Sequence, residues 1–152
     1  MQTQTRIIWL KVASDAVVLF GLLIAFASIP STAAPALFLA DLIFWPVDGV
    51  QAVSTETNRL LSAILGGVMV GWGLLLYLLT TRLYPRDPGL ARLLIMASIG
   101  TWFFVDSLGS IAAGAPLNAL FNLGFLALFV IPLWLPGSPL TLQSREPVSP
   151  KR

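Results

Sequence analysis

Residues 60–81 read LLSAILGGVMVGWGLLLYLLTT, without one charged side chain. An α-helix rises about 1.5 Å per residue and the hydrocarbon core of a bilayer is about 30 Å thick, so about 20 apolar residues cross it. This stretch therefore predicts a membrane-spanning helix. Three further stretches have the same character, the last of them near the minimum length: residues 7–29, 90–113 and 117–135.

The composition of the whole chain also fits a protein that faces lipid. Of its 152 residues, 57% are hydrophobic and 11% are charged, whereas a soluble domain carries about 25% charged residues. So few charges could not cover a surface that faces water. We therefore predict an all-α fold, an integral membrane four-helix bundle that forms a single transmembrane domain over residues 1–136, followed by a disordered cytoplasmic tail over residues 137–152.

The basic residues predict how the chain threads through the membrane. All nine Lys and Arg residues except Arg59 fall on one side of the four-span arrangement. Segments rich in Lys and Arg stay in the cytoplasm, so both termini are predicted to be cytoplasmic. The minimal loops indicate a bacterial inner membrane. The residues on the cytoplasmic side are Arg6, Lys11, Arg82, Arg86, Arg92, Arg145, Lys151 and Arg152.

The connection over residues 30–58 is predicted to lie outside. Residues 36–45 are apolar but too short to span, so they predict a short external helix that lies at the membrane interface or is tucked over the bundle. Asp48 and Gln51 have the spacing of a helix-capping pair, which predicts that another helix begins near Gly49 and runs into the second span. A long connection of this kind is often functional.

A signal peptide is the rival interpretation of the first span. Arg6 and Lys11 precede an apolar run that ends in Ala25-Phe26-Ala27, which has the pattern of a cleavage site. Cleavage would leave three spans and an external N-terminus.

Chemistry that needs cysteine or histidine is excluded, because the chain contains neither. This removes disulfides, thiol and imidazole catalysis, and haem or zinc held by histidine. We therefore predict no metal, no cofactor and no enzymatic activity. No basic cluster with interleaved aromatic residues indicates nucleic acid as a partner.

A polar patch is predicted where the third and fourth spans meet below the outer surface. Asp106 and Ser110 lie four residues apart on one span, and Asn118 and Asn122 lie four apart on the other. Arg59 is close enough in depth to reach Asp106, which would otherwise stay protonated, since a bare carboxylate in hydrocarbon is very unfavourable. Three roles remain open for the patch: a hydrogen-bonded knot between helices, a binding site for a lipid headgroup or solute, and catalysis.

Lys11 and Asp15 lie one helical turn apart inside the first span. Ionisable groups within a span are costly and tend to be functional. They predict an intramembrane ion pair, with a proton-linked or substrate-linked Asp15 as the alternative. Deep in the second and third spans, Trp72 and Trp102 are interpreted either as packed core or as stacking partners for a ring of a lipid-soluble ligand.

Small residues recur at intervals of four in the second span, at Ala63, Gly67 and Gly71. A face of this kind lets another helix backbone approach closely. The leading interpretation is packing within the bundle, together with the neighbouring Gly66 and Gly73. The alternative is contact with another copy or another protein.

One resemblance rests on a set of short segments between Asn58 and Asn122. The segments are Asn58-Arg59-Leu60-Leu61-Ser62, the glycine run 66–73, Arg86-Asp87-Pro88, Asp106-Ser107, Gly109-Ser110 and Asn118 to Asn122. They resemble small bacterial four-span membrane proteins that are commonly left uncharacterised, and the resemblance implies no activity. Small multidrug exporters also carry an acid in their first span, but they are shorter and lack so long an external connection. The motif residues of the sterol-isomerase-like four-span family cannot be placed in this chain.

Together these features favour a non-enzymatic integral membrane protein. It would serve as an accessory or structural subunit that packs against other membrane helices, in a hetero-complex or homo-oligomer, with membrane lipids as partners and a lipid held at the polar patch. The alternative is a small proton-coupled solute carrier that acts as an oligomer, with Asp15 or Asp106 as the protonatable site. An enzyme acting on a lipid-soluble substrate is the least favoured class.

Overall fold

The computed structural model describes residues 3–135, and the regular structure of this part of the chain is entirely helical. Four of its helices are long and apolar enough to cross a membrane, which confirms the predicted all-α fold with four candidate spans. The predicted tail over 137–152 lies outside the described residues. In chain order the elements are α1 (Thr3–Phe26), the short turn η1 (Pro30–Thr32), α2 (Ala34–Phe44), α3 (Glu56–Leu78), the π-helical turn η2 (Leu79–Leu83), α4 (Pro88–Ala112) and α5 (Pro116–Trp134).

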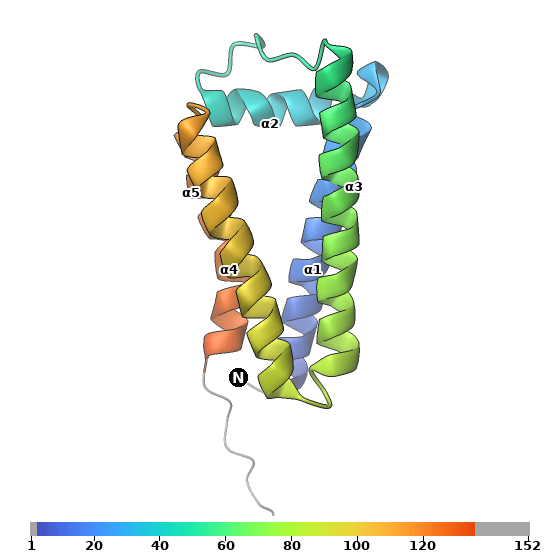
Figure 1. Cartoon of the computed structure of the whole chain (residues 1–152), viewed down its shortest axis with the longest axis vertical. Helices are drawn as coiled ribbons and strands as arrows, with labels where there is room; N and C mark the ends of the chain where they lie inside the picture. Colours follow the sequence, from blue (N-terminus) through green and yellow to red (C-terminus); the bar gives the residue numbers. More distant parts are fainter. Residues whose placement is uncertain (1–2, 136–152) are drawn as a thin grey trace, which may run out of the picture.

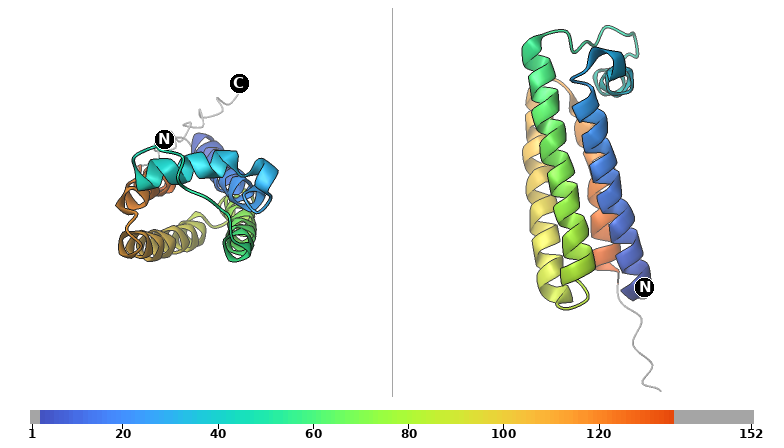
Figure 2. Two further views of the ribbon diagram at one scale, coloured as in Figure 1. Left: turned by 90° about the horizontal axis from the view of Figure 1, so that it is seen from above. Right: turned by 90° about the vertical axis from the view of Figure 1, so that its right-hand side faces the viewer.

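The long helices form two pairs, α1 with α3 and α4 with α5 (Figure 1). The pairs lie close together at the end that holds the N-terminus of α1 and the turn between η2 and α4, which we call the closed end. They diverge toward the opposite, open end. There α2 lies across the bundle, from the α1 side to α5, as Figure 1 and the left view of Figure 2 show. The predicted short helix over 36–45 is thus present, and it runs roughly at right angles to the spans.

The buried apolar core occupies the closed half of the bundle. It draws on the first half of α1, the second half of α3, the first half of α4 and the end of α5. Because antiparallel helices place these segments at the same level, the core seals the closed half and leaves the open half without an equivalent cluster. The core residues are Leu10, Ala13, Val17, Met69, Leu76, Tyr84, Ala91, Ile95, Ile99, Phe129 and Leu133.

Glycines set the close approach of α1 and α3. A Cβ added at Gly66 would lie 2.3 Å from the backbone nitrogen of Ala25, and one at Gly73 would lie 2.7 Å from a methyl carbon of Val18. On α1, a Cβ at Gly21 would meet α3 at 2.8 Å. Absent side chains at these points allow backbone-to-backbone packing, which is how helices associate closely in lipid.

The start of α3 differs from its prediction. The hydroxyl of Thr55 accepts a hydrogen bond from the backbone nitrogen of Asn58 at 3.1 Å, which caps the helix at Glu56. Asp48 instead accepts from the backbone nitrogen of Val50 at 3.1 Å, two residues on. Gly49 between them has a φ of 71°, in the left-handed region. The prediction of a helix from Gly49 is therefore wrong, because a local turn takes the acceptor that would have capped it.

Arg6 joins three segments at the closed end. Its Nη1 donates to the hydroxyl of Tyr84 at 3.0 Å, and its Nη2 donates to the carbonyl oxygen of Leu135. Beside it, the guanidinium of Arg92 stacks over the ring of Trp134, 5.2 Å from the ring centroid. Basic side chains thus tie the ends of α1, α4 and α5 together at the level where the helices converge.

Candidate functional site

Asp106 is the centre of a hydrogen-bonded network between α4 and α5. Its Oδ1 accepts from the hydroxyl of Ser110 at 3.0 Å, from Nδ2 of Asn118 at 2.9 Å and from Nδ2 of Asn122 at 3.0 Å. Asn118 also donates to the hydroxyl of Ser110 at 2.8 Å. The structure therefore brings together four of the five residues predicted for the polar patch. They meet because each helix presents its pair of polar residues on one face, one turn apart.

Two polar residues near the open half were not singled out from the sequence. Ser107 accepts from Nδ2 of Asn122 at 3.2 Å and is buried. Its role could have been inferred from Asn122, because a side-chain amide carries two hydrogens and Asn122 therefore needs a second acceptor beside Asp106. Asp41 on α2 is also buried; its Oδ2 accepts from the backbone nitrogen of Gly49 at 3.1 Å, while its Oδ1 is enclosed with no donor among residues 3–135. Nothing in the sequence distinguishes Asp41 from the exposed Asp48.

Arg59 does not belong to this network, so the predicted pairing with Asp106 is wrong. Its Nε donates to the carbonyl oxygen of Ser28 at 2.8 Å, and its side chain lies in a shallow depression at the open end of the α1–α3 pair. Ser28 lies in the turn that follows α1, where its carbonyl oxygen is within reach of α3. Arg59 therefore links α3 to the end of α1, within one helix pair.

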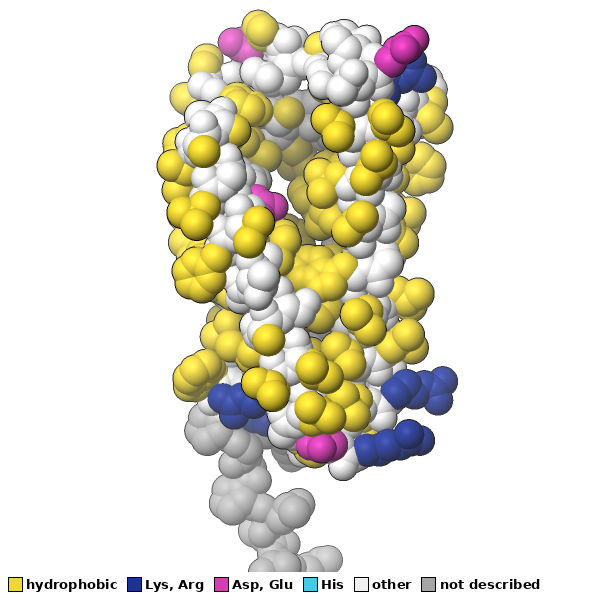
Figure 3. Space-filling model, in the orientation of Figure 1, with side chains coloured by type: hydrophobic (Ala, Val, Ile, Leu, Met, Phe, Trp, Pro, Cys, Tyr) yellow, Lys and Arg dark blue, Asp and Glu magenta, His cyan; other side chains and the backbone are white. Residues whose placement is uncertain are grey.

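The second carboxylate oxygen of Asp106 has a different environment from the first. No donor within residues 3–135 reaches Oδ2, and the atom is not enclosed by the protein. One oxygen is thus fixed by three donors while the other stays available as an acceptor. Figure 3 shows a hollow between the two helix pairs in the upper half of the bundle.

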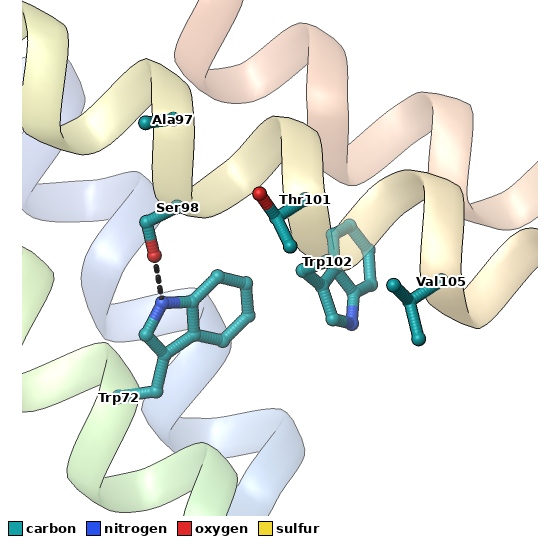
Figure 4. A pocket seen from close by; sticks show the side chains of 6 residues that line it. All are labelled: Trp72, Ala97, Ser98, Thr101, Trp102 and Val105. Carbon is teal, nitrogen blue, oxygen red and sulfur yellow. Dashed lines mark hydrogen bonds between the residues drawn. The ribbon is translucent and has the colours of Figure 1, made fainter.

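An open depression of about 560 Å³, which we call the cavity, lies on the side of the bundle between α3 and α4. The indole rings of Trp72 and Trp102 lie next to each other in it, with the hydroxyls of Ser98 and Thr101 nearby (Figure 4). The indole Nε1 of Trp72 donates to the hydroxyl of Ser98 at 2.6 Å, and the ring centroids of Trp72 and Trp102 are 5.5 Å apart. Both tryptophans are half-buried. The lining residues are Trp72, Ala97, Ser98, Thr101, Trp102 and Val105.

The depression and the Asp106 network lie on neighbouring faces of α4. Ser98, Trp102, Asp106 and Ser110 follow one another at intervals of four residues, and each step turns the row by about 40°, so it passes from the depression to the side that faces α5. From Trp102 a chain of ring contacts continues inward to α5 and α1: its centroid is 6.2 Å from that of Phe125, which is 5.4 Å from that of a phenylalanine on α1, Phe20. The aromatic rings therefore link all four long helices beneath the polar network.

Lys11 and Asp15 are not paired in the structure. The Nζ of Lys11 lies over the ring of Tyr77, 5.6 Å from its centroid, and among the described residues no ion pair joins it to Asp15. The side chain of Asp15 is exposed on the outer surface of α1. The predicted intramembrane ion pair is therefore wrong, because the aromatic face of Tyr77 on α3 provides an alternative partner for the lysine.

Ala63, Gly67 and Gly71 point away from the bundle. All three are exposed, and a Cβ added at Gly67 or Gly71 would meet nothing within 4 Å. The prediction that they pack within the bundle is wrong, whereas the neighbouring Gly66 and Gly73 do pack there. The two sets differ by one or two positions, about 100 to 200° around a helix with 3.6 residues per turn. This small-residue stripe is therefore open to a contact outside the chain.

Comparison with known proteins provides no further assignment: no protein-family model, no curated protein and no solved structure matches this chain. Within residues 3–135, no group of three or more Asp, Glu, His or Cys side chains is placed to hold a metal ion. What the site can do therefore has to be argued from its own geometry.

Proposed function

We propose that this chain is a non-enzymatic integral membrane protein that holds a small amphiphile in the hollow between α3 and α4. The polar end of the amphiphile would lie at Asp106 and its apolar part in the cavity beside Trp72 and Trp102. The observation that carries the proposal is the unengaged oxygen of Asp106, one helical turn from Trp102 and the largely apolar depression that Trp102 lines. An unpaired carboxylate oxygen in lipid is costly, so a ligand that bonds to it would stabilise the site.

The division of the bundle into a packed and a hollow half supports this role. The apolar core holds the closed half together and borders the depression at Trp72, so the open half beyond it is free to carry polar groups. Its network contributes about 0.6–2 kcal/mol per interhelical hydrogen bond, the range for membrane helices. That is enough to orient a binding group without serving as the main source of stability.

We place the chain in a bacterial inner membrane with both termini in the cytoplasm. The closed end holds Arg6, Arg82, Arg86 and Arg92, and basic segments favour the cytoplasmic side. The open end, with α2 lying across it, would then face outward. An amphiphile could enter the hollow sideways between α3 and α4 from the outer leaflet.

The outer face of the α1–α3 pair supports a further part of the proposal, an accessory role in a larger assembly. The stripe of Ala63, Gly67 and Gly71 is open, and the exposed carboxylate of Asp15 lies about 12 Å into the membrane if the span begins at Ile7. A carboxylate facing lipid at that depth is unfavourable. Packing against another membrane helix, in a hetero-complex or a homo-oligomer, would cover both features.

Native mass spectrometry of the protein purified from its own membranes tests both parts. The wild-type chain is expected to retain a bound amphiphile, and Asp106→Asn is expected to lose it while keeping its partners. A Gly67→Leu/Gly71→Leu variant is expected to do the reverse. A wild-type chain that carries no bound amphiphile would contradict the binding role, and a monomer without partners would contradict the accessory role.

A proton-coupled solute carrier is the second candidate. Helices that converge at one end and diverge at the other are expected of one state of a carrier that opens to alternate sides. In that case Asp106→Asn or Asp15→Asn would abolish uptake by proteoliposomes without loss of folded protein. An enzyme is disfavoured because the site offers a carboxylate, amides and hydroxyls but no histidine or cysteine; turnover of a lipid by the purified chain would overturn that.

A further inference from the structure

We infer that the amphiphile of this site carries a protonated amine close to a flat, aromatic group. This inference rests on the proposed binding role and adds the chemical class of the ligand. It follows from which atoms of the network are already engaged, from the charges near the site, and from the two indole rings of the cavity.

The donors of the site are directed at the protein. The amide nitrogens of Asn118 and Asn122 and the hydroxyl of Ser110 all donate to Oδ1 of Asp106. An incoming phosphate or carboxylate would have to displace these bonds before it found a donor. The free atom, Oδ2, is an acceptor. At the Asp106 network itself, an incoming group therefore meets a free acceptor and no free donor, which favours a ligand that donates a hydrogen bond there.

The charges of the site favour a cation among such donors. Within residues 3–135, no Lys or Arg forms an ion pair with Asp106, and the nearest candidate from the sequence, Arg59, is bonded to the carbonyl of Ser28. A protonated amine would form a charge-assisted hydrogen bond with Oδ2, about twice as strong as a neutral one. The same group would supply the basic partner that Arg59 does not provide.

The aromatic part of the ligand follows from the position of the tryptophans. Trp102 lies one helical turn from Asp106 on α4, a rise of about 6 Å. The indole ring of Trp72 packs against that of Trp102, with 5.5 Å between the centroids, and the two rings line the same side of the depression together. A ring in this cavity could contact indole faces, and an amine attached one or two bonds from it could reach toward Oδ2. Indole also attracts cations directly.

Photolabelling with three matched benzophenones tests the inference. The probes share one flat aromatic body and carry an aminomethyl, a hydroxymethyl or a carboxyl group. The full-length protein is placed in nanodiscs of phosphatidylcholine, whose zero net charge avoids electrostatic enrichment of the charged probes. After illumination, peptide mass spectrometry measures labelling of residues 97–105 relative to the lipid-facing side of α3. The variants are Asp106→Asn, which keeps an oxygen for the three donors but replaces the free acceptor, Asp106→Glu, which keeps the charge, and Asp15→Asn as the matched control.

The amine probe is expected to label residues 97–105 at least about tenfold more than the other two, since one charge-assisted bond is worth roughly a factor of ten. Asp106→Asn should remove that preference, whereas Asp106→Glu and Asp15→Asn should keep it. Equal labelling by all three probes, or a preference that survives in Asp106→Asn, would overturn the amine assignment and leave the binding role intact. If no probe labels residues 97–105 above the lipid-facing side of α3, the proposed function fails as well.

Discussion

Asn122 on α5 donates a hydrogen bond to Asp106 on α4 over 3.0 Å, and its amide also donates to the hydroxyl of Ser107. The side chain of Asn122 is 5% exposed, so it is the most buried residue of the Asp106 network. The pair thereby fixes which oxygen of Asp106 is held and which one remains free. Substitution of Asn122 should therefore weaken the packing of α4 against α5 more than substitution of any other residue of the network.

Replacing Asn122 with leucine is expected to lower the free energy of unfolding by about 1–2 kcal/mol, because it removes two interhelical hydrogen bonds in lipid. Unfolding in mixed detergent, followed by circular dichroism, measures the change. Asn58→Leu is the matched control, since the Asn58 side chain is exposed and forms no hydrogen bond with another helix of residues 3–135. An equal loss in both variants would show that the bonds to Asp106 and Ser107 carry no stability.

Gly66 and Gly67 are adjacent in sequence but should respond oppositely to alanine. A methyl at Gly66 would lie 2.3 Å from backbone of α1, so Gly66→Ala is expected to destabilise the fold by about 1–3 kcal/mol through overpacking. A methyl at Gly67 would meet nothing within 4 Å, so Gly67→Ala should be close to neutral in the isolated chain. Thermal stability by size-exclusion chromatography in detergent separates the two; a neutral Gly66→Ala would contradict the described α1–α3 packing.

Arg6 should be hard to replace, even by another cation. Lysine has one charged nitrogen and lacks the planar fork that lets Arg6 reach both Tyr84 and the carbonyl of Leu135. Arg6→Lys is therefore expected to cost about 1–3 kcal/mol, the range for a hydrogen bond to a charged group. Arg82→Lys, at an exposed position on the same end, is the control that keeps the charge count equal. Equal stability of the two variants would mean that the tie at the closed end is dispensable.

The spans could be predicted from the sequence because length and apolarity are local properties. Residues 60–81 had to be helical in lipid, where every backbone group needs an internal partner. The short helix α2 followed from apolar residues bounded by proline. The start of α3 could not be predicted, because Asp48 and Thr55 can both cap a helix. The left-handed backbone of Gly49 turns the chain after Asp48, so the helix begins after Thr55 instead.

The polar network was predictable for a related reason: the short turn between α4 and α5 makes them neighbours, so depth alone aligns Asp106 with Asn122. The partners of Arg59 and Lys11 depend instead on distances between helices that a sequence does not specify. The stripe at Gly67 shows the same limit. Spacing identifies small faces on a helix, but only the rotation of α3 decides that Gly66 and Gly73 face α1.

The central claim is that the two ends of α3 lie on opposite sides of a bilayer, with the hollow toward the outside. The natural absence of cysteine allows a direct test by single-cysteine labelling. Ser54→Cys places a thiol at the exposed open end and Arg86→Cys places one at the exposed closed end. With a membrane-impermeant maleimide, the Ser54→Cys variant is expected to be labelled in intact cells, and the Arg86→Cys variant after permeabilisation alone. Labelling of both variants in intact cells, or the reverse pattern, would contradict the account.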